Sequence, residues 1–276
     1  MVSDSNQLSD IVAGLATLLF VPADRPERYA KAASSGADAI IIDLEDAVAP
    51  ENKDMARASI ASALPDGCPV LIRINGAGTA WHQEDVSAVA GLAIAGVILP
   101  KTEQPEAVSS LARDLAGPVV VPLVETAAGM EAARRIARAQ GAARLAFGSI
   151  DYAADLGCAH EREALLAGRS ELVLASRLGG LPPPIDGITE AIDEAALIED
   201  DARHAARLGF GGKLCIHPRQ IGPAARGLRP SDADIDWARA VLASGSGAAE
   251  KVDGRMVDAP VRARARTILA RAGVGS

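Results

Sequence analysis

The chain has 276 residues, of which 49% are hydrophobic and 23% are charged. This composition builds a globular core and excludes wholesale disorder. The net charge of −8, with no long basic run, argues against nucleic acid or an acidic membrane as the main partner.

Eight short apolar runs recur along the chain, separated by longer segments of helical pattern. Continuous apolar runs without in–out alternation are typical of parallel strands that are buried on both faces. The predicted strands span residues 17–21, 39–44, 70–74, 96–99, 119–124, 144–148, 184–188 and 212–216. The seventh run opens on prolines, which fit only the first position of a strand.

The segments between these runs predict helices. Asp24, followed by Pro26 and Glu27, indicates a helix start with Asp24 as the N-cap, and segment 131–139 is rich in the helix formers Ala and Arg. Eight such units predict an α/β fold, the (β/α)8 TIM barrel. The alternative is an open doubly wound sheet, but the turn after the first run has no GxGxxG pattern for a dinucleotide.

A C-terminal extension follows the eighth run. Ser231 predicts the N-cap of a helix over 231–242, a loop of small residues follows at 245–250, and a last helix ends near Ala272. We expect a catalytic barrel domain over 1–226 and a helical extension or lid over 227–276. The extension either packs under the barrel or crosses to a neighbouring subunit.

Cysteine usage and hydropathy indicate the compartment. The three cysteines, Cys68, Cys158 and Cys215, are an odd number without CxxC spacing, which fits neither a disulfide framework nor a zinc knuckle. The apolar run 11–22 lacks the basic flank of a signal peptide, and the longest uncharged stretch, 86–100, is too short to span a membrane. We therefore expect a soluble, cytoplasmic protein.

Polar residues follow nearly every predicted strand, at the barrel end where active sites of this fold lie. Asp24 and Asp46 fit helix caps as well as catalysis, and His217 fits a packed or capping role better than a ligand's role. Arg73 lies inside an apolar run and Glu125 directly follows one, so each must pair or face a ligand. The other polar strand ends are Arg25, Asp43, Glu45, Asn75, Lys101, Asp151 and Asp186.

The acidic strand ends indicate a hard cation. Glu125 and Asp151 follow neighbouring strands, so their carboxylates can converge, and two carboxylates with water and substrate oxygens suit Mg²⁺. Asp43, Glu45 and Asp46 could hold the waters around that ion. A plain salt-bridge network is the alternative. Zinc is disfavoured because the four histidines show no HxxxH or HxH spacing.

Lys101 has two interpretations. A lysine at a strand end can form a Schiff base, which would make the protein a metal-free aldolase. Several carboxylates are expected nearby, so an ion pair with them is the favoured interpretation.

Over essentially its whole length the sequence resembles the citrate lyase β-subunit-like proteins of the HpcH/HpaI aldolase/citrate lyase family. Each matching segment is weak alone, but their order together is highly specific. The segments are Leu19-Phe20-Val21-Pro22-Ala23-Asp24-Arg25-Pro26-Glu27-Arg28, Ile42-Asp43-Leu44-Glu45-Asp46-Ala47-Val48, Arg73-Ile74-Asn75, Leu99-Pro100-Lys101, Leu123-Val124-Glu125-Thr126, Phe147-Gly148 with Asp151, and Cys215-Ile216-His217-Pro218.

The resemblance implies a (β/α)8 barrel, commonly a homotrimer or hexamer, that uses Mg²⁺. Glu125 and Asp151 match the metal ligands, and Arg73 matches the arginine that binds the carboxylate or keto acid part of the substrate. Glu125 is also expected to take part in substrate binding, through the metal ion that it holds. Asp43, Glu45 and Asp46 match the acidic cluster near the metal, with Asp46 the best candidate for a water-mediated ligand.

The segment 253–260 resembles the tail of the family's acyl-CoA lyases. There the aspartate that matches Asp258 closes over a neighbouring subunit's site and acts as an acid/base. On the residues alone, Asp258 is also a good N-cap for the last helix. The tail is short here, and its lead-in at 245–250 departs from the family pattern.

The expected reaction is reversible, Mg²⁺-dependent cleavage of a carbon–carbon bond in a 3-hydroxyacyl-CoA of the citramalyl, malyl, citryl or methylglutaryl type. The products are a keto acid and a short acyl-CoA. Arg73 would stabilise the developing negative charge and Asp258 would protonate the enolate. The alternatives are a CoA-independent keto acid aldolase and a citrate lyase complex subunit that is inactive alone.

Overall fold

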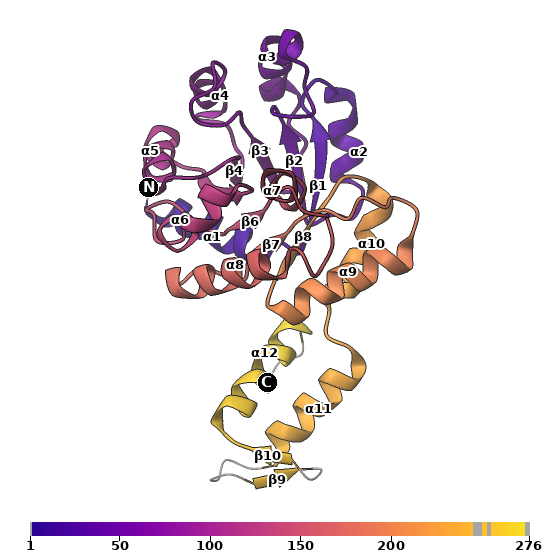
Figure 1. Cartoon of the computed structure of the whole chain (residues 1–276). Helices are drawn as coiled ribbons and strands as arrows, with labels where there is room; N and C mark the ends of the chain where they lie inside the picture. Colours follow the sequence, from indigo (N-terminus) through magenta and orange to yellow (C-terminus); the bar gives the residue numbers. More distant parts are fainter. Residues whose placement is uncertain (1, 245–249, 253–254, 274–276) are drawn as a thin grey trace.

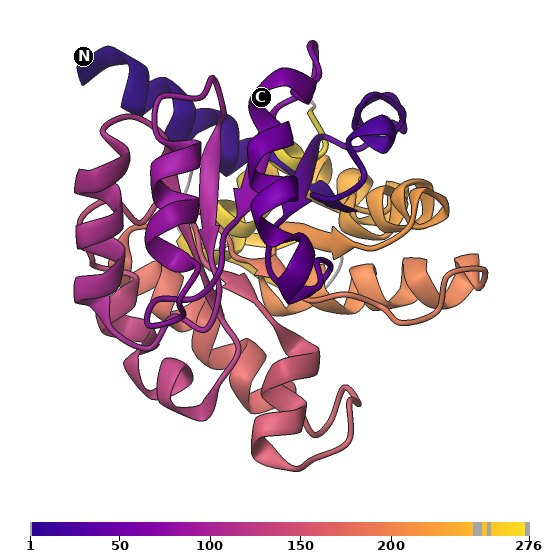
Figure 2. The ribbon, with the colours of Figure 1, turned by 90° about the horizontal axis from the view of Figure 1, so that it is seen from above.

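Eight parallel strands close into a barrel, which Figure 2 shows from above. The strands follow one another in sequence order, and β1 pairs with both β2 and β8. The computed structural model describes residues 2–244, 250–252 and 255–273. The strands are β1 Thr17–Pro22, β2 Ala39–Asp43, β3 Val70–Arg73, β4 Gly96–Leu99, β5 Val119–Val124, β6 Ala146–Phe147, β7 Ile185–Asp186 and β8 Gly212–Cys215. The predicted (β/α)8 barrel is confirmed.

Two apolar layers explain why the strand sequences read as unbroken apolar runs. Successive side chains of a strand point to opposite faces. On β2, Ile41 joins a cluster that fills the barrel, while Ile40 and Ile42 join the larger cluster between barrel and helices. Both faces are therefore dry, and residues of one run divide between the two layers.

Helices surround the barrel and also precede and follow it (Figure 1). The helices around the barrel are α2 Tyr29–Ala33, α3 Lys53–Ala63, α4 His82–Val89, α5 Pro105–Leu115, α6 Ala127–Ile136, α7 Ser149–Leu156, α8 Leu166–Gly179, α9 Ala195–Leu208 and α10 Ile221–Leu228, with 3-10 turns η1 Pro26–Arg28, η2 Pro50–Asn52 and η3 Pro218–Gln220. In the part of the chain that the structure describes, no helix is long and apolar enough to cross a membrane.

The sixth and seventh strands are the shortest in the structure. β7 begins only at Ile185, directly after the prolines at 182–184, because proline fixes φ and has no N–H for the ladder. β6 consists of Ala146 and Phe147 alone, although we predict a strand over 144–148. Arg144, at the start of that run, has a different role.

Arg144 ties the N-terminal helix α1 (Val2–Gly14) to the barrel. Its guanidinium is 1% exposed and donates from Nη1 to the carbonyls of Val12 and Leu15, at 3.0 and 2.6 Å, and from Nε to that of Pro183, at 2.7 Å. Val12 and Leu15 pack into the cluster inside the barrel. Helix α1 therefore closes the amino-terminal end of the barrel and leaves the carboxyl-terminal end open. No pattern in the sequence predicts this helix.

One predicted helix start is wrong. Asp24 is not a cap, because the chain first turns with Arg25 N donating to the Pro22 carbonyl, so η1 starts one residue later with Arg25 at its N-cap. Helix α6 contains most of the predicted helical segment 131–139 and begins at Ala127, because the Thr126 side chain accepts from the Gly129 amide and caps it.

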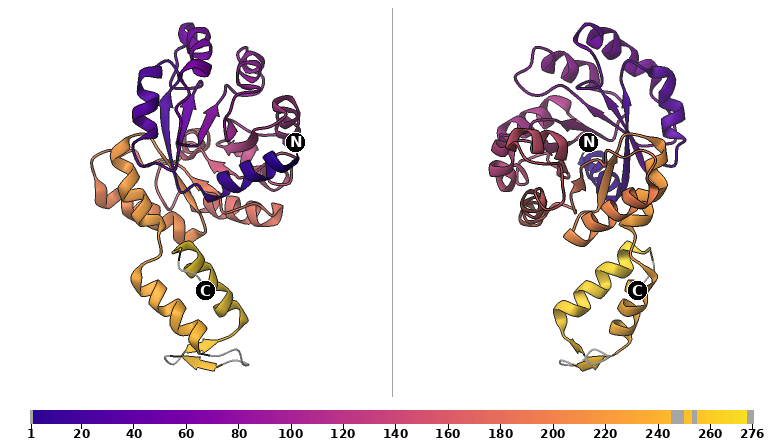
Figure 3. Two further views of the ribbon diagram at one scale, coloured as in Figure 1. Left: turned by 180° about the vertical axis from the view of Figure 1, so that it is seen from behind. Right: turned by 45° about the vertical axis from the view of Figure 1, so that its right-hand side comes forward.

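The C-terminal residues form a separate projection, seen from two sides in Figure 3. Helices α11 (Asp232–Ala243) and α12 (Ala259–Arg271) pack on each other, and the short strands β9 (Glu250–Val252) and β10 (Arg255–Val257) pair at its far tip (Figure 1). Their apolar side chains form a cluster apart from the barrel's. The N-cap at Ser231 is confirmed. Of the predicted loop 245–250, residues 245–249 lie outside the described residues, and Glu250 belongs to β9.

Candidate active site

The strand period places the polar strand ends in the mouth of the barrel. Arg73 and Glu125 lie two residues after Leu71 and Leu123, which belong to the cluster inside the barrel. A separation of two returns a side chain to the same face. Both polar side chains therefore point inward, at the open carboxyl-terminal end.

Arg73 is held by a fork of carboxylates. Its Nε and Nη2 donate to the two oxygens of Asp43 at 2.7 and 2.6 Å, and its Nη1 lies 3.0 Å from Glu45 and 3.4 Å from Asp46. The guanidinium also stacks on the Phe20 ring at 4.8 Å. Burial opposes the charge, but these carboxylates raise the pKa of Arg73 above its ordinary value. Arg73 is a fixed cation.

Asp43 lies behind Arg73 and is fully engaged. Besides the two guanidinium bonds, its oxygens accept from the amides of Glu45 and Ala47 at 3.0 and 3.1 Å. The side chain is 2% exposed and does not line the cavity described below. Of the acidic cluster predicted near the metal, only Asp46 lines that cavity.

Lys101 joins two of the carboxylates. Its Nζ donates to Glu45 Oε1 at 2.5 Å, and its backbone N donates to Glu125 Oε1 at 2.7 Å. Its φ of 47° is left-handed, a conformation that costs free energy for a residue with a side chain. This backbone bend aims the amide at Glu125. The ion-pair interpretation of Lys101 fits this geometry better than a Schiff base.

Glu125 is a buried acid beside other acids. It is 1% exposed, and burial first, then the nearby charges of Glu45 and Asp151, raise its pKa to about 8. A Cβ at Gly148 would overlap its carboxylate, so the glycine permits this close approach. Only the Lys101 amide donates a hydrogen bond to it among the described residues. A cation at this carboxylate would relieve the electrostatic cost.

Glu125 and Asp151 share a cavity of about 310 Å³ in the barrel mouth. Asp151 is half-buried in the first turn of α7, and no described residue donates a hydrogen bond to its carboxylate. The polar lining is Asp46, Arg73, Glu125, Ser149 and Asp151. The donor set consists of hard oxygens with a shortage of positive charge, which fits Mg²⁺.

No group of three or more His, Cys, Asp and Glu side chains in the described ranges is arranged to hold a metal. An ion here would therefore depend on two carboxylates and on oxygens from water or substrate. The structure brings together Arg73, Glu125, Asp151 and Asp46 as we predict.

The strand ends named Asp186 and His217 do not reach this cavity. On β7, Ile185 points into the barrel, so the next side chain, Asp186, points outward toward the helices. There Asp186 pairs with Lys213 at 2.8 Å and with Arg169 at 2.9 Å. His217 is the N-cap of η3 and accepts from the Arg219 amide. The predicted capping role of His217 is confirmed.

The sequence does not reveal how the loop 44–46 is held, although Asn75 is one of the predicted polar strand ends. Lys53 is buried, and its Nζ donates to the carbonyls of Leu44 and Glu45 at 2.7 and 2.9 Å. Asn75 Nδ2 donates to Leu44 O at 3.1 Å and to the fully buried Asp85 at 2.6 Å. No local signal marks a lysine or an aspartate in a helix as a support of a distant loop.

A second missed group is a hydrogen-bonded chain of Ser149, His160 and Glu190. The His160 ring lies 2.9 Å from Ser149 Oγ and 3.2 Å from Glu190. The order resembles a nucleophile–base pair, but Ser149 is 2% exposed, with its hydroxyl pressed toward Gly187. The chain therefore anchors the start of α7, the helix that carries Asp151.

Asp258 lies away from this cavity in its own chain. It is exposed and caps α12 by accepting from the Val261 amide at 3.1 Å. The start of α12 follows β10, at the far tip of the C-terminal projection (Figure 1). The predicted N-cap is confirmed, and Asp258 does not meet Arg73 or Glu125 within one chain.

The fold and cavity define a (β/α)8-barrel enzyme site in which a fixed arginine faces two under-neutralised carboxylates. Residues 16–218 match the family model described as HpcH/HpaI aldolase/citrate lyase. A citrate lyase subunit beta-like protein of Mycobacterium tuberculosis is 41% identical over 266 residues, which cover 92% of this chain and 94% of the relative. A (3S)-malyl-CoA thioesterase of Cereibacter sphaeroides is 32% identical over 269 residues, 93% of this chain and 94% of the relative.

A solved structure is also similar. The crystal structure of CitE from M. tuberculosis in complex with magnesium, acetoacetate and coenzyme A has a TM-score of 0.86 and 38% identity, and the match covers 95% of this chain and 99% of that one. The chain belongs to the HpcH/HpaI aldolase/citrate lyase family. The predicted family and the predicted enzyme class, a carbon–carbon lyase, are confirmed. The expected cofactor, Mg²⁺, is the ion bound in the M. tuberculosis structure.

Proposed function

We propose that this protein is a Mg²⁺-dependent lyase that reversibly cleaves a carbon–carbon bond in a 3-hydroxyacyl-CoA, yielding a keto acid and a short acyl-CoA. The acyl group is of the citramalyl, malyl, citryl or methylglutaryl type. The single observation that carries this proposal is the convergence of Arg73, Glu125 and Asp151 on one cavity. The magnesium, acetoacetate and coenzyme A in the M. tuberculosis relative support it.

Glu125 and Asp151 are the residues that would hold Mg²⁺, with Asp46 binding through water. When bound, the ion supplies Lewis-acid stabilisation to the substrate oxygens. Lys101 orients Glu125 through its backbone amide, so the ligand is preorganised.

Arg73 is the residue that recognises the keto acid part of the substrate. Its guanidinium lines the cavity while Asp43, behind it, fixes its plane. A fixed planar fork binds a carboxylate and stabilises negative charge that develops during bond cleavage.

Asp258 would act as the acid/base that protonates the enolate, in the site of a neighbouring subunit. Its place at the tip of the projection, apart from its own barrel, supports action between subunits. The assembly we propose is a homotrimer or hexamer. We place the protein in the cytoplasm, which its three free cysteines support.

The test is a panel of citryl-, malyl-, citramalyl- and 3-hydroxy-3-methylglutaryl-CoA, incubated with the purified protein and Mg²⁺. Keto acid and free thiol are both measured, with EDTA as the control. Metal-dependent keto acid release without free thiol from one of these thioesters identifies the substrate.

Two other results would contradict the proposal. Thiol release without keto acid would indicate thioester hydrolysis, the activity named for the C. sphaeroides relative. No reaction with any thioester, combined with cleavage of a free keto acid or with activity only after partner subunits are added, would favour the CoA-independent aldolase or the complex subunit.

A further inference from the structure

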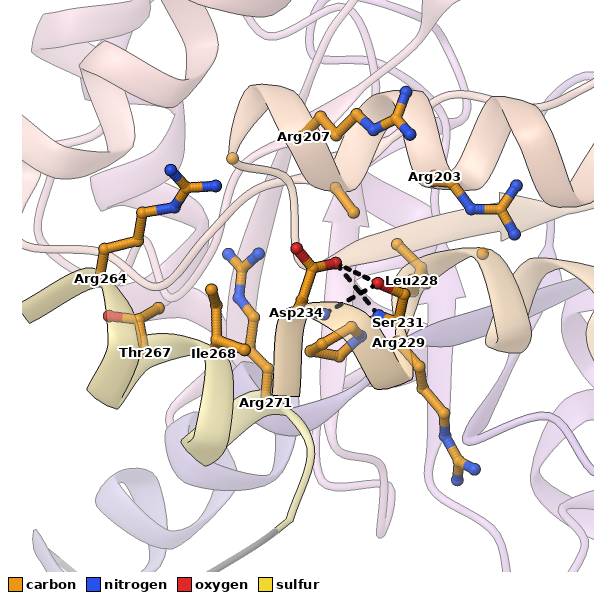
Figure 4. A pocket seen from close by; sticks show the side chains of 14 residues that line it. Arg203, Arg207, Leu228, Arg229, Ser231, Asp234, Arg264, Thr267, Ile268 and Arg271 are labelled. Atoms are coloured by element: carbon orange, nitrogen blue, oxygen red, sulfur yellow. Dashed lines mark hydrogen bonds between the residues drawn. The ribbon is translucent and has the colours of Figure 1, made fainter. Parts of the chain in front are cut away.

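A cleft of about 790 Å³ separates the barrel from the C-terminal projection. Its walls are the ends of α9 and α10, the linker 229–231 and one side of α12 (Figure 4). It shares no lining residue with the cavity that holds Glu125 and Asp151. The cleft is therefore a separate place at which a ligand can bind.

Arginine dominates the charge of this cleft. The chain as a whole has a net charge of −8, yet the cleft is lined by five arginines and one aspartate, Asp234. Two of the arginines come from α9, one from the linker and two from α12. They are Arg203, Arg207, Arg229, Arg264 and Arg271.

The acids nearby are already engaged. The Asp234 carboxylate accepts from the hydroxyl and amide of Ser231, at 2.6 and 3.3 Å, in the capping box of α11. Glu199 pairs with Arg203 at 2.6 Å and also with Arg226. Neither acid neutralises the remaining arginines of the cleft.

Three exposed arginines of the cleft have no ion-pair partner among the described residues, and Asp200, the acid that interacts with Arg207, is already paired with Arg162 at 2.8 Å. Within the described ranges, the side chains of Arg207, Arg229 and Arg271 make no ion pair and no hydrogen bond. Arg264 stacks on the Trp237 ring at 5.1 Å.

The two walls belong to different cores. Ile198 and Ala202 anchor α9 in the barrel's outer cluster, whereas Ala265 and Leu269 anchor α12 in the cluster of the projection. Arg203 and Arg207 on α9 thus lie on one side of the joint, and Arg264 and Arg271 on α12 lie on the other (Figure 4). An anion that contacts both walls would attract arginines of the barrel and arginines of the projection at the same time.

We propose that this cleft is a binding site for an oligophosphate, a small molecule with two or more phosphoryl groups. Guanidinium forks bind phosphoryl oxygens in pairs, and arginines on two walls require an anion with more than one charged group. The volume suits a ligand of nucleotide size. The site fixes the projection against the barrel, and this inference does not depend on the lyase function.

The test is calorimetric titration of the full-length protein with tripolyphosphate, without added Mg²⁺ because the ion chelates the probe. We expect one site per chain, with affinity that falls as salt increases. The variant Arg207→Gln/Arg271→Gln should weaken binding at least tenfold. Arg266→Gln, on α12 but not in the cleft, is the matched control and should bind like the wild type.

A second measurement covers the case in which the double variant does not fold. In the wild type, tripolyphosphate should slow hydrogen exchange in peptides that contain the linker 229–231 and residues 264–271. Protection confined to the loops at 43–46 and 125 would overturn the proposal, as would binding that is lost in Arg73→Gln but kept in the double variant.

Three further ligands test the chemistry. ATP that binds better than adenosine 3′,5′-bisphosphate would identify a nucleoside polyphosphate, and the reverse order would identify the phosphates of a CoA-like ligand; either supports the site. Citrate binding as tightly as tripolyphosphate would overturn the phosphate assignment. A third result would also overturn it: the wild type binds no anion, and the double variant loses its oligomeric state. The arginines would then serve a subunit interface.

Discussion

Glu125 and Arg73 show how single residues of this site depend on opposite electrostatics. Arg73 is surrounded by carboxylates, which keep it charged. Glu125 is buried beside other acids, with one backbone hydrogen bond. The site therefore stabilises the charged form of Arg73 and destabilises the charged form of Glu125 as long as no metal ion is bound.

Replacing Glu125 with Gln should raise the stability of the metal-free protein and abolish tight Mg²⁺ binding. The pKa of Glu125 rises from 4.5 in the unfolded chain to about 8 in the fold. The folded state then binds more protons between these values, so stability falls as pH rises from about 5 to 8. Glu125→Gln has no ionisable group at this position, so its stability should not fall in this way as pH rises.

Thermal unfolding in EDTA at several pH values measures this effect, with a shift of about 2–4 °C for each kcal/mol recovered. Glu131→Gln, at an exposed position on α6, is the control and should follow the wild-type curve. An unchanged pH slope in Glu125→Gln, or unchanged Mg²⁺ affinity by calorimetry, would contradict the assignment.

Replacing Arg73 with Lys should reduce kcat/KM by about 10²-fold or more, since lysine keeps the charge but loses the fork that Asp43 orients. Steady-state kinetics on the identified substrate measure this. Arg134→Lys, at an exposed pair with Glu171, should leave kinetics unchanged. Near wild-type turnover in the Arg73 variant would remove this residue from the mechanism.

At the scale of elements, the barrel is open at one end because α1 closes the other. The helix has no apolar pattern strong enough to predict it from sequence, and it is held through three backbone carbonyls that accept from Arg144. Burial lowers the pKa of Arg144 to about 10, so the arginine remains charged at neutral pH.

Replacing Arg144 with Met should destabilise the fold by about 2–4 kcal/mol, because it leaves buried carbonyls without donors. Urea unfolding measures the loss, and Arg113→Met on the exposed face of α5 is the control. A change below about 0.5 kcal/mol, the size usual for surface substitutions, would show that water replaces the arginine.

At the scale of the whole molecule, the projection separates Asp258 from the barrel mouth of its own chain (Figure 1). A symmetric oligomer can supply the missing residue, because each subunit then offers its tip to the next. The cleft of five arginines lies at the joint of this projection.

Co-expression of Asp258→Asn and Glu125→Ala subunits should restore activity that neither variant has alone. If Asp258 acts between subunits, random mixing gives roughly a quarter of sites with both residues intact. Activity assays on purified mixed oligomers measure this. Absence of recovery, with mixing verified by mass spectrometry, would contradict action between subunits.

The sequence by itself determined the eight strands, the barrel and the candidate residues, because burial on both faces leaves an unbroken apolar pattern and polar strand ends interrupt it. Only the tertiary structure decided which strand ends meet. Glu125 points into the barrel, whereas Asp186 points outward to Arg169 on a helix. Asp43 supports Arg73 through a hydrogen bond between residues 30 positions apart in the sequence. The arginine cleft joins residues 203 to 271, so no local pattern could reveal it. These contacts depend on how elements pack, which sequence spacing does not encode.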